Sequence, residues 1–212
     1  SDLVEKLPEI AQESSKALNN AGTGHAGYCE LNYTPPNPQG QVDIQRALEI
    51  NAAFEISLQF WSHLVASDKS LDPATFINRV PHLSAVWGEK NIEFLKARYE
   101  QMRRHPQFAQ MAWSDDPQTL ADWMPLLMNG RPAGPRLAAT QVAHGADVNF
   151  AALTRTLVGY LQQNANFQLL THTRVTALHR QPGNPQRWTL QAKNLQQGEA
   201  LTFDTPFVFL GA

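Results

Sequence analysis

The sequence has very little cysteine, with Cys29 as the only one among 212 residues. A single cysteine excludes an internal disulfide, which is typical of a protein that folds in a reducing compartment. A lone thiol becomes a nucleophile only beside an activating group, and the flanking residues Gly27, Tyr28 and Glu30 do not indicate a base. We therefore expect Cys29 to be unreactive.

The sequence also lacks a basic surplus and long apolar runs. It has 17 Lys and Arg against 19 Asp and Glu, and Arg103-Arg104 is the densest basic pair, so we expect no nucleic-acid partner. No apolar run approaches the ~18 residues of a membrane span, and the first residues lack the pattern of a signal peptide. With 42% hydrophobic residues, the chain is expected to be soluble and to bury a core of one or two domains.

Several catalytic and metal-binding motifs are absent. The seven histidines form no H-x-H, H-E-x-x-H or Cys-paired pattern, so we expect no metal site. There is no G-x-S-x-G of a hydrolase and no G-x-x-x-x-G-K-[ST] phosphate loop. Most of the histidines read as surface or hydrogen-bonded residues, and His25, in a loop rich in Gly and Asn, is the candidate among them for facing a ligand.

Apolar spacing predicts a mixed α/β fold. Residues recurring at intervals of three and four predict helices after Asp43, over 92–102, from Asp116-Pro117 to Met124, and after Asn149. A strand is predicted over 83–87. Beyond residue 165 the period changes to two, which predicts short strands with turns at 182–185 and 197–198. These later strands, over 167–171, 174–180, 187–193 and 200–203, form an expected antiparallel meander.

The two ends of the sequence resemble interrupted strands. Residues 2–6 read as the end of a short strand that carries an acid, Glu5, and 207–210 form the continuous apolar run of a strand buried in a parallel sheet. We expect both ends to be cut from a larger protein, with exposed apolar surface that favours self-association.

Gly22, Gly24 and Gly27 match the G-x-G-x-x-G pattern of dinucleotide-binding loops. That motif needs an apolar strand before it and a helix after it, because the pyrophosphate meets the helix N-terminus. The polar residues 12–16 and the Pro-rich residues 32–36 supply neither. We interpret the loop as a Gly-rich segment near some ligand. Glu5 reads either as a solvated charge or as an acid that binds ribose hydroxyls.

Two blocks carry a family resemblance: Asn-Asn-Ala-Gly-Thr-Gly-His at 19–25 and Glu-Leu-Asn-Tyr-Thr-Pro at 30–35. Shorter matches occur at 11–15, 76–78, 80–82, 86–89, 94–99 and 147–149. With these blocks, the whole chain resembles the bacterial malate:quinone oxidoreductases, within the D-amino-acid-oxidase-like flavoproteins.

The resemblance implies a Rossmann-like FAD-binding domain, partly present at 1–41 and 146–212, with an inserted sheet-and-helix substrate domain at 42–145. It implies oxidation of (S)-malate to oxaloacetate by an FAD enzyme that reduces membrane quinone, attached peripherally at the cytoplasmic face of the inner membrane. A related 2-hydroxyacid oxidoreductase, such as one for 2-hydroxyglutarate, and a non-catalytic α/β interaction module remain alternatives.

The resemblance also assigns cofactor-binding residues. Glu5 matches the ribose-binding acid, Val175 lies where backbone groups pair with adenine, and Gly211 begins a turn over the cofactor. The loop past the pyrophosphate and flavin contains Ser14, Ser15, Asn20, Gly22 and His25. The family's phosphate loop and its catalytic base are expected outside this chain, which we therefore expect to be inactive alone.

Overall fold

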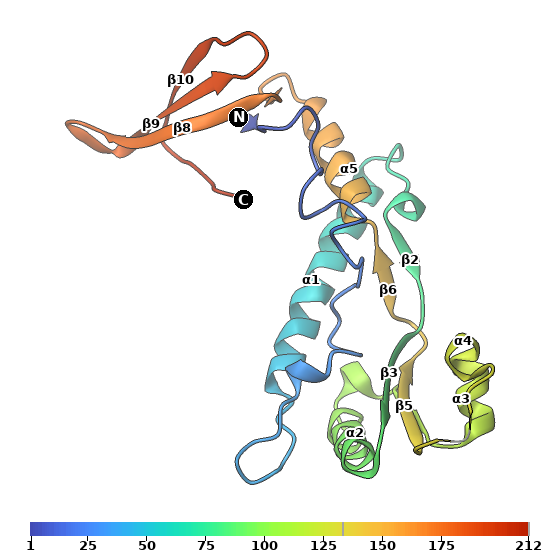
Figure 1. Ribbon diagram of the computed structural model, residues 1–212. Helices are drawn as coiled ribbons and strands as arrows, with labels where there is room; N and C mark the ends of the chain where they lie inside the picture. Colours follow the sequence, from blue (N-terminus) through green and yellow to red (C-terminus); the bar gives the residue numbers. More distant parts are fainter. Residues whose placement is uncertain (133, 212) are drawn as a thin grey trace. The chain divides into compact units, whose positions relative to one another are not determined.

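The computed structural model describes residues 1–132 and 134–211 (Figure 1). It contains two compact units, which we describe separately: unit 1 comprises residues 1–21 and 149–211, and unit 2 comprises residues 22–148. The mixed α/β fold class is confirmed. In this division residues 22–41 lie in unit 2, where the carbonyl of Gly22 accepts the N–H of Val148 at 2.6 Å. The domain roles expected for 1–41, 42–145 and 146–212 stay predictions.

Unit 2 is built on an antiparallel sheet with the strand order β3-β5-β4, and a second antiparallel pair joins β2 to β6. Its strands are β2 (Ile77–Arg79), β3 (His82–Trp87), β4 (Ala112–Ser114), β5 (Leu137–Val142) and β6 (Ala146–Val148). Its helices are α1 (Gln45–Ser67), α2 (Glu89–Met102), α3 (Pro117–Trp123) and α4 (Pro125–Met128), with short 3-10 turns η1 (Leu31–Tyr33), η2 (Pro73–Thr75) and η3 (Pro106–Phe108).

Two local signals fix the order of elements around this sheet. Gly88 separates β3 from α2 with a φ of 85°, a left-handed conformation that favours glycine. Asp116 caps α3, since its side chain accepts the N–H of Thr119 at 2.8 Å, and Pro117 occupies the first turn. The predicted helices over α1, α2 and α3 and the predicted strand over β3 are therefore confirmed.

The core of unit 2 extends to the loop that follows Gly24. Ala26 and Tyr28 are buried against Ala47 of α1 and Met102 of α2. A separate cluster joins α2 to the sheet through Val86, Ile92, Leu95 and Ala138. Burial of apolar surface on both sides thus holds the loop between the two helices.

Unit 1 contains a parallel pair and a meander. β1 (Asp2–Val4) pairs in parallel with β7 (Gln168–Leu170), which follows helix α5 (Phe150–Gln162). The strands β8 (Thr173–Gln181), β9 (Asn184–Asn194) and β10 (Ala200–Thr205) form the antiparallel ribbon drawn in orange and red in Figure 1. The side chain of Asn149 caps α5 by accepting the N–H of Ala152 at 3.0 Å. The predicted cap is confirmed, and so is the antiparallel meander for the strands over 174–180, 187–193 and 200–203. The strand predicted over 167–171 lies outside the meander, because it pairs in parallel with β1.

The buried strand predicted over 207–210 is wrong. Phe207, Phe209 and Leu210 are 72%, 81% and 74% exposed, and the segment has no strand assignment. A strand needs a neighbour to complete its backbone hydrogen bonds, and none of the described strands pairs with this segment.

As for membrane spans, the described residues contain no helix that has both the length and the apolar character to cross a membrane.

Candidate functional site

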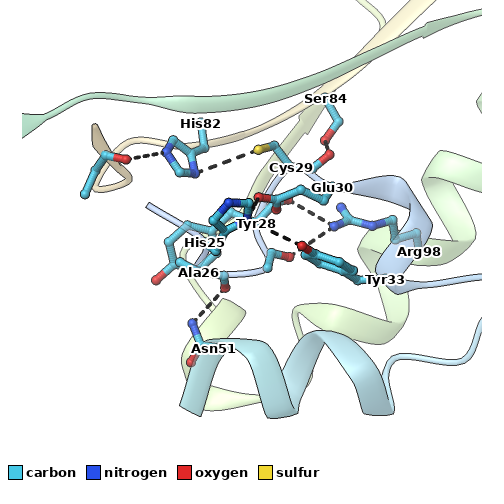
Figure 2. A network of polar contacts seen from close by, with 12 residues as sticks. His25, Ala26, Tyr28, Cys29, Glu30, Tyr33, Asn51, His82, Ser84 and Arg98 are labelled. Atoms are coloured by element: carbon cyan, nitrogen blue, oxygen red, sulfur yellow. Dashed lines mark hydrogen bonds and ion pairs between the residues drawn. The ribbon is translucent and has the colours of Figure 1, made fainter. Parts of the chain in front are cut away.

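A group of polar side chains meets in unit 2 around the loop 25–34. We call it the polar network; Figure 2 shows it between α1, α2 and β3. Its labelled members are His25, Ala26, Tyr28, Cys29, Glu30, Tyr33, Asn51, His82, Ser84 and Arg98. The loop supplies six of these ten, while Asn51 comes from α1, Arg98 from α2, and His82 and Ser84 from β3.

His25 is the accessible member, with 55% of its side chain exposed. Its Nδ1 lies 3.3 Å from Oε1 of Glu30 and 3.4 Å from the hydroxyl of Tyr33. The Glu30 side chain is only 16% exposed, and neither of its oxygens has an aligned hydrogen-bond donor among the described residues, so its contact with His25 is electrostatic. Because a carboxylate only accepts, this contact favours the proton on Nδ1 and leaves the lone pair on Nε2. His25 is therefore arranged as a proton acceptor.

The backbone between His25 and Glu30 is anchored from three sides. Each of four consecutive carbonyls accepts a hydrogen bond from a buried side chain of another element. The bonds run from Asn51 Nδ2 to Ala26 (2.9 Å), from Arg98 Nη2 to Gly27 (3.2 Å) and Tyr28 (3.0 Å), and from Ser84 Oγ to Cys29 (2.8 Å).

Arg98 is the most deeply buried charge of the network, with an exposure of 0%. Its Nε donates to Oγ1 of Thr34 at 2.9 Å, so it contacts both the start and the end of the loop. Burial lowers the pKa of Arg98 to about 10, which leaves the guanidinium protonated at neutral pH. Its Nη1 has no hydrogen-bond acceptor among the described residues.

Cys29 lies beside a base that the sequence did not indicate. Its Sγ is 3.9 Å from Nδ1 of His82, whose Nε2 is 3.0 Å from the carbonyl of Ala146. That carbonyl favours the His82 proton on Nε2, and the Glu30 carboxylate is a second acceptor near the thiol. Burial, with the charge of Glu30 adding to it, raises the pKa of Cys29 from 9.0 to about 11. The thiol is therefore protonated at neutral pH, in agreement with the expected lack of reactivity.

Close packing within unit 2 explains why glycine occupies these positions of the G-x-G-x-x-G pattern. A Cβ on Gly22 would lie 2.5 Å from Oδ1 of Asp147, and one on Gly27 would lie 2.9 Å from the carbonyl of Ala47. Both residues also have positive φ values, 73° and 70°. No strand precedes this loop directly and η1 follows it, so the structure agrees that it is not a Rossmann phosphate loop. Contact between Gly22 and a cofactor stays a prediction.

In unit 1, the structure brings Glu5 close to the start of β8. The carbonyl of Glu5 accepts the N–H of Thr173 at 2.8 Å, and Val175 follows two residues later. One carboxylate oxygen of Glu5 accepts the N–H of Leu7 at 2.8 Å, while the other has no partner among the described residues. Val175 is 42% exposed on an edge strand, beside a bulge at residue 176. The acid and the strand edge therefore border the same part of unit 1.

The remaining predicted residues of unit 1 lie outside regular elements. The carbonyl of Ser14 accepts a hydrogen bond from Nδ2 of Asn20 at 3.2 Å, and Ser15 lies half-buried in the same turn-rich segment. Gly211 is exposed. Six of the eight predicted residues thus fall in unit 1, while Gly22 and His25 fall in unit 2. Among the described residues, no cluster of His, Cys, Asp and Glu side chains has the form of a metal site.

Known proteins similar in sequence include several described as malate:quinone oxidoreductases. The family model "Malate:quinone oxidoreductase (Mqo)" matches residues 1–212. A "Probable malate:quinone oxidoreductase" of Tolumonas auensis is 66% identical over 99% of this chain, and one of Methylobacillus flagellatus is 53% identical over the same share. In both cases the chain spans 42% of the relative's length.

Two solved structures are similar in fold. L-alpha-glycerophosphate oxidase from Mycoplasma pneumoniae, a structure with FAD bound, matches 91% of this chain and 43% of its own, with a TM-score of 0.63 and 18% identity. L-amino acid deaminase from Proteus myxofaciens matches 91% of this chain and 37% of its own, with a TM-score of 0.55 and 16% identity. At these identities the likeness concerns the fold.

Proposed function

Because the chain belongs to the malate:quinone oxidoreductase family, we propose that the whole protein oxidises (S)-malate to oxaloacetate with bound FAD and passes the electrons to a membrane quinone. The family match over residues 1–212 carries the proposal. The fold adds support, since a glycerophosphate oxidase with FAD bound shares it. The chain corresponds to 42% of its relatives' length, so other parts of the protein contribute to this activity.

Unit 1 has donors and acceptors that fit the adenosine part of FAD. The second carboxylate oxygen of Glu5, at the carboxyl end of the parallel strand β1, is available to accept hydrogen bonds from ribose hydroxyls. The open edge of β8 at Val175 offers backbone groups to adenine. We assign Ser14, Ser15, Asn20, Gly22 and Gly211 to the rest of the cofactor site on the family resemblance alone.

Bound FAD would supply the hydride acceptor, and the chain would supply a place for the hydroxyl proton of malate. A general base must hold a free lone pair and be accessible to substrate. His25 meets both conditions, because Nε2 has no partner among the described residues and 55% of the side chain is exposed. Glu30, which contacts Nδ1, stabilises the imidazolium that forms when Nε2 takes the proton. His25 is therefore the proposed base, in place of one outside the chain.

The domain roles, the membrane and the partners belong to the same proposal. Unit 1 would form part of the FAD-binding domain and unit 2 part of the substrate domain. Quinone reduction implies peripheral attachment of the whole protein to the cytoplasmic face of the inner membrane. The exposed Phe207, Phe209 and Leu210 favour self-association of this chain when it is isolated.

The experiment is to purify the full-length protein and record its visible absorbance with and without malate. We expect flavin bands that bleach with malate under anaerobic conditions, and malate-dependent reduction of a soluble quinone analogue. A panel with 2-hydroxyglutarate and L-alpha-glycerophosphate identifies the substrate. Faster oxidation of either of these would reassign it, and a colourless protein that ignores malate would end the proposal.

A further inference from the structure

Segment 26–29, the four residues between His25 and Glu30, sets the distance between their side chains. Its carbonyls are fixed by Asn51, Ser84 and Arg98, which are 1%, 6% and 0% exposed. Hydrogen bonds to buried donors hold a loop that would otherwise sample many conformations. The contact between Nδ1 of His25 and Oε1 of Glu30, at 3.3 Å, therefore depends on donors outside the loop.

Arg98 alone joins the two ends of the loop. Its Nη2 donates to the carbonyls of Gly27 and Tyr28, before Glu30, and its Nε donates to Oγ1 of Thr34, after Glu30 and Tyr33. That hydroxyl in turn donates to the carbonyl of Leu31 at 3.1 Å. Both groups that contact Nδ1 of His25 thus lie on a segment closed by one guanidinium.

Burying the charge of Arg98 costs free energy of folding. The side chain is fully buried, and no carboxylate among the described residues lies within 4.0 Å of it. Only a guanidinium carries several donors in one rigid plane, and an ammonium has neither the reach nor the fork. A merely apolar side chain would fill the space but would leave the carbonyls of Gly27 and Tyr28 unpaired. The loop therefore requires the several coplanar hydrogen-bond donors that only arginine has.

We propose that Arg98 is a positioning residue, which keeps Glu30 and Tyr33 on Nδ1 of His25 and so holds the imidazole in the tautomer with its lone pair on Nε2. The catalytic consequence rests on the proposed function, in which His25 is the base. The positioning of the His25 side chain does not depend on the proposed function, and it is measured separately by the tautomer of His25.

The test uses the full-length protein with R98M, R98K and S84A, where S84A removes only the hydrogen bond to Cys29. Nitrogen-15 NMR of labelled histidine, assigned by the signals lost in H25Q, reports the tautomer of His25 at a pH where imidazoles are neutral. Wild type is expected to show a protonated Nδ1 and an unprotonated Nε2. In R98M these two signals are expected to move toward the averaged values of a free imidazole, with R98K and S84A in between.

Steady-state kinetics provide the second readout. We expect R98M to lower kcat for malate by about 100-fold, the scale expected when a catalytic group is misplaced by about 1 Å, while KM and bound FAD change little. K96M is the control, because Lys96 is an exposed cation on the same helix and its side chain has no hydrogen bond or ion pair with the described residues. We expect it to match wild type in both readouts.

Each outcome distinguishes the two proposals. A wild-type His25 signature in R98M or, where R98M does not fold, in R98K would overturn the positioning role of Arg98. A shifted signature in a protein that does not oxidise malate would support positioning and reject the proposed reaction. Loss of FAD and of thermal stability with an unchanged signature would assign Arg98 to folding alone.

Discussion

The backbone N–H of Gly24 donates to the carbonyl of Ala146 at 2.8 Å. A Cβ at residue 24 would lie 2.7 Å from that carbonyl oxygen and 2.8 Å from Cζ of Phe54. Gly24 is thus held against β6 and α1 so closely that no side chain fits. The middle glycine of a pattern associated with dinucleotides has a structural explanation that involves no ligand.

Gly24→Ala is therefore expected to destabilise unit 2 by about 1–3 kcal/mol, the usual cost of overpacking. Urea unfolding followed by circular dichroism measures the change. Gly159→Ala is the control: it lies in α5 with no atom within 4 Å of its Cβ, so it should stabilise its helix by about 0.5–1 kcal/mol. An unchanged unfolding midpoint for Gly24→Ala, together with lost FAD binding, would instead place this glycine against the cofactor.

Cys29 is expected to react slowly with iodoacetamide at neutral pH, because only the thiolate is nucleophilic. The raised pKa, about 11 compared with an ordinary value of 9.0, means that the rate should keep rising with pH beyond 9. Mass spectrometry of the alkylated peptide at a series of pH values measures this rate. The same chain in denaturant should react at the rate of an ordinary cysteine. Fast alkylation of the folded protein at neutral pH would contradict the assignment.

Signals confined to a few residues predicted much of the fold. The caps at Asp116 and Asn149, and the glycine turn at Gly88, fix element ends through contacts within four residues. Such interactions depend little on the remainder of the chain. For this reason the sequence predicted the helices of seven or more residues in the described part of the chain, and three strands of the meander.

The central strand of unit 2 was missed for a physical reason. The residues of β5, Leu137–Val142, are almost all buried, so polar and apolar positions do not alternate along it. The reverse error affected 207–210, where an apolar run was taken for a strand without knowledge of its neighbours. Strand assignment from composition fails in both cases, because pairing is not local.

The polar network could not be predicted from the sequence for a similar reason. Glu30 is five residues from His25, but Arg98 and His82 come from elements more than 50 residues further along the chain. Only the packing of α2 and β3 against the loop brings them together. The sequence singled out His25 from its loop, and nothing in the spacing indicated Arg98.

Glu5→Gln is expected to weaken FAD binding by the full-length protein about tenfold, since hydrogen bonds to a charged acceptor contribute about 1.5–3 kcal/mol and an amide retains part of this. Titration of FAD into the apoprotein, followed by flavin fluorescence, measures the dissociation constant. Glu9→Gln is the matched control, because Glu9 is exposed and, among the described residues, its carboxylate accepts a hydrogen bond only from Gln12. Equal dissociation constants for the two variants would remove Glu5 from the cofactor site.

His25→Gln is expected to lower kcat for malate by about 10²–10⁴-fold, the usual contribution of a general base. Glu30→Gln should lower it by at least about 10-fold, because an amide also donates and no longer fixes the proton on Nδ1. Both variants should retain FAD, since neither side chain is assigned to holding it. Stopped-flow bleaching of the flavin by malate separates the chemical step from quinone reduction.

His63→Gln and Glu93→Gln are the controls for these two changes, because both residues are exposed on helices of the same unit. Full activity is expected from each. The decisive comparison is between the two site variants: if His25 is the base and Glu30 only orients it, the double variant should be no slower than His25→Gln alone. Multiplicative losses would mean that Glu30 acts independently of His25, and unchanged bleaching in His25→Gln would move the base outside this chain.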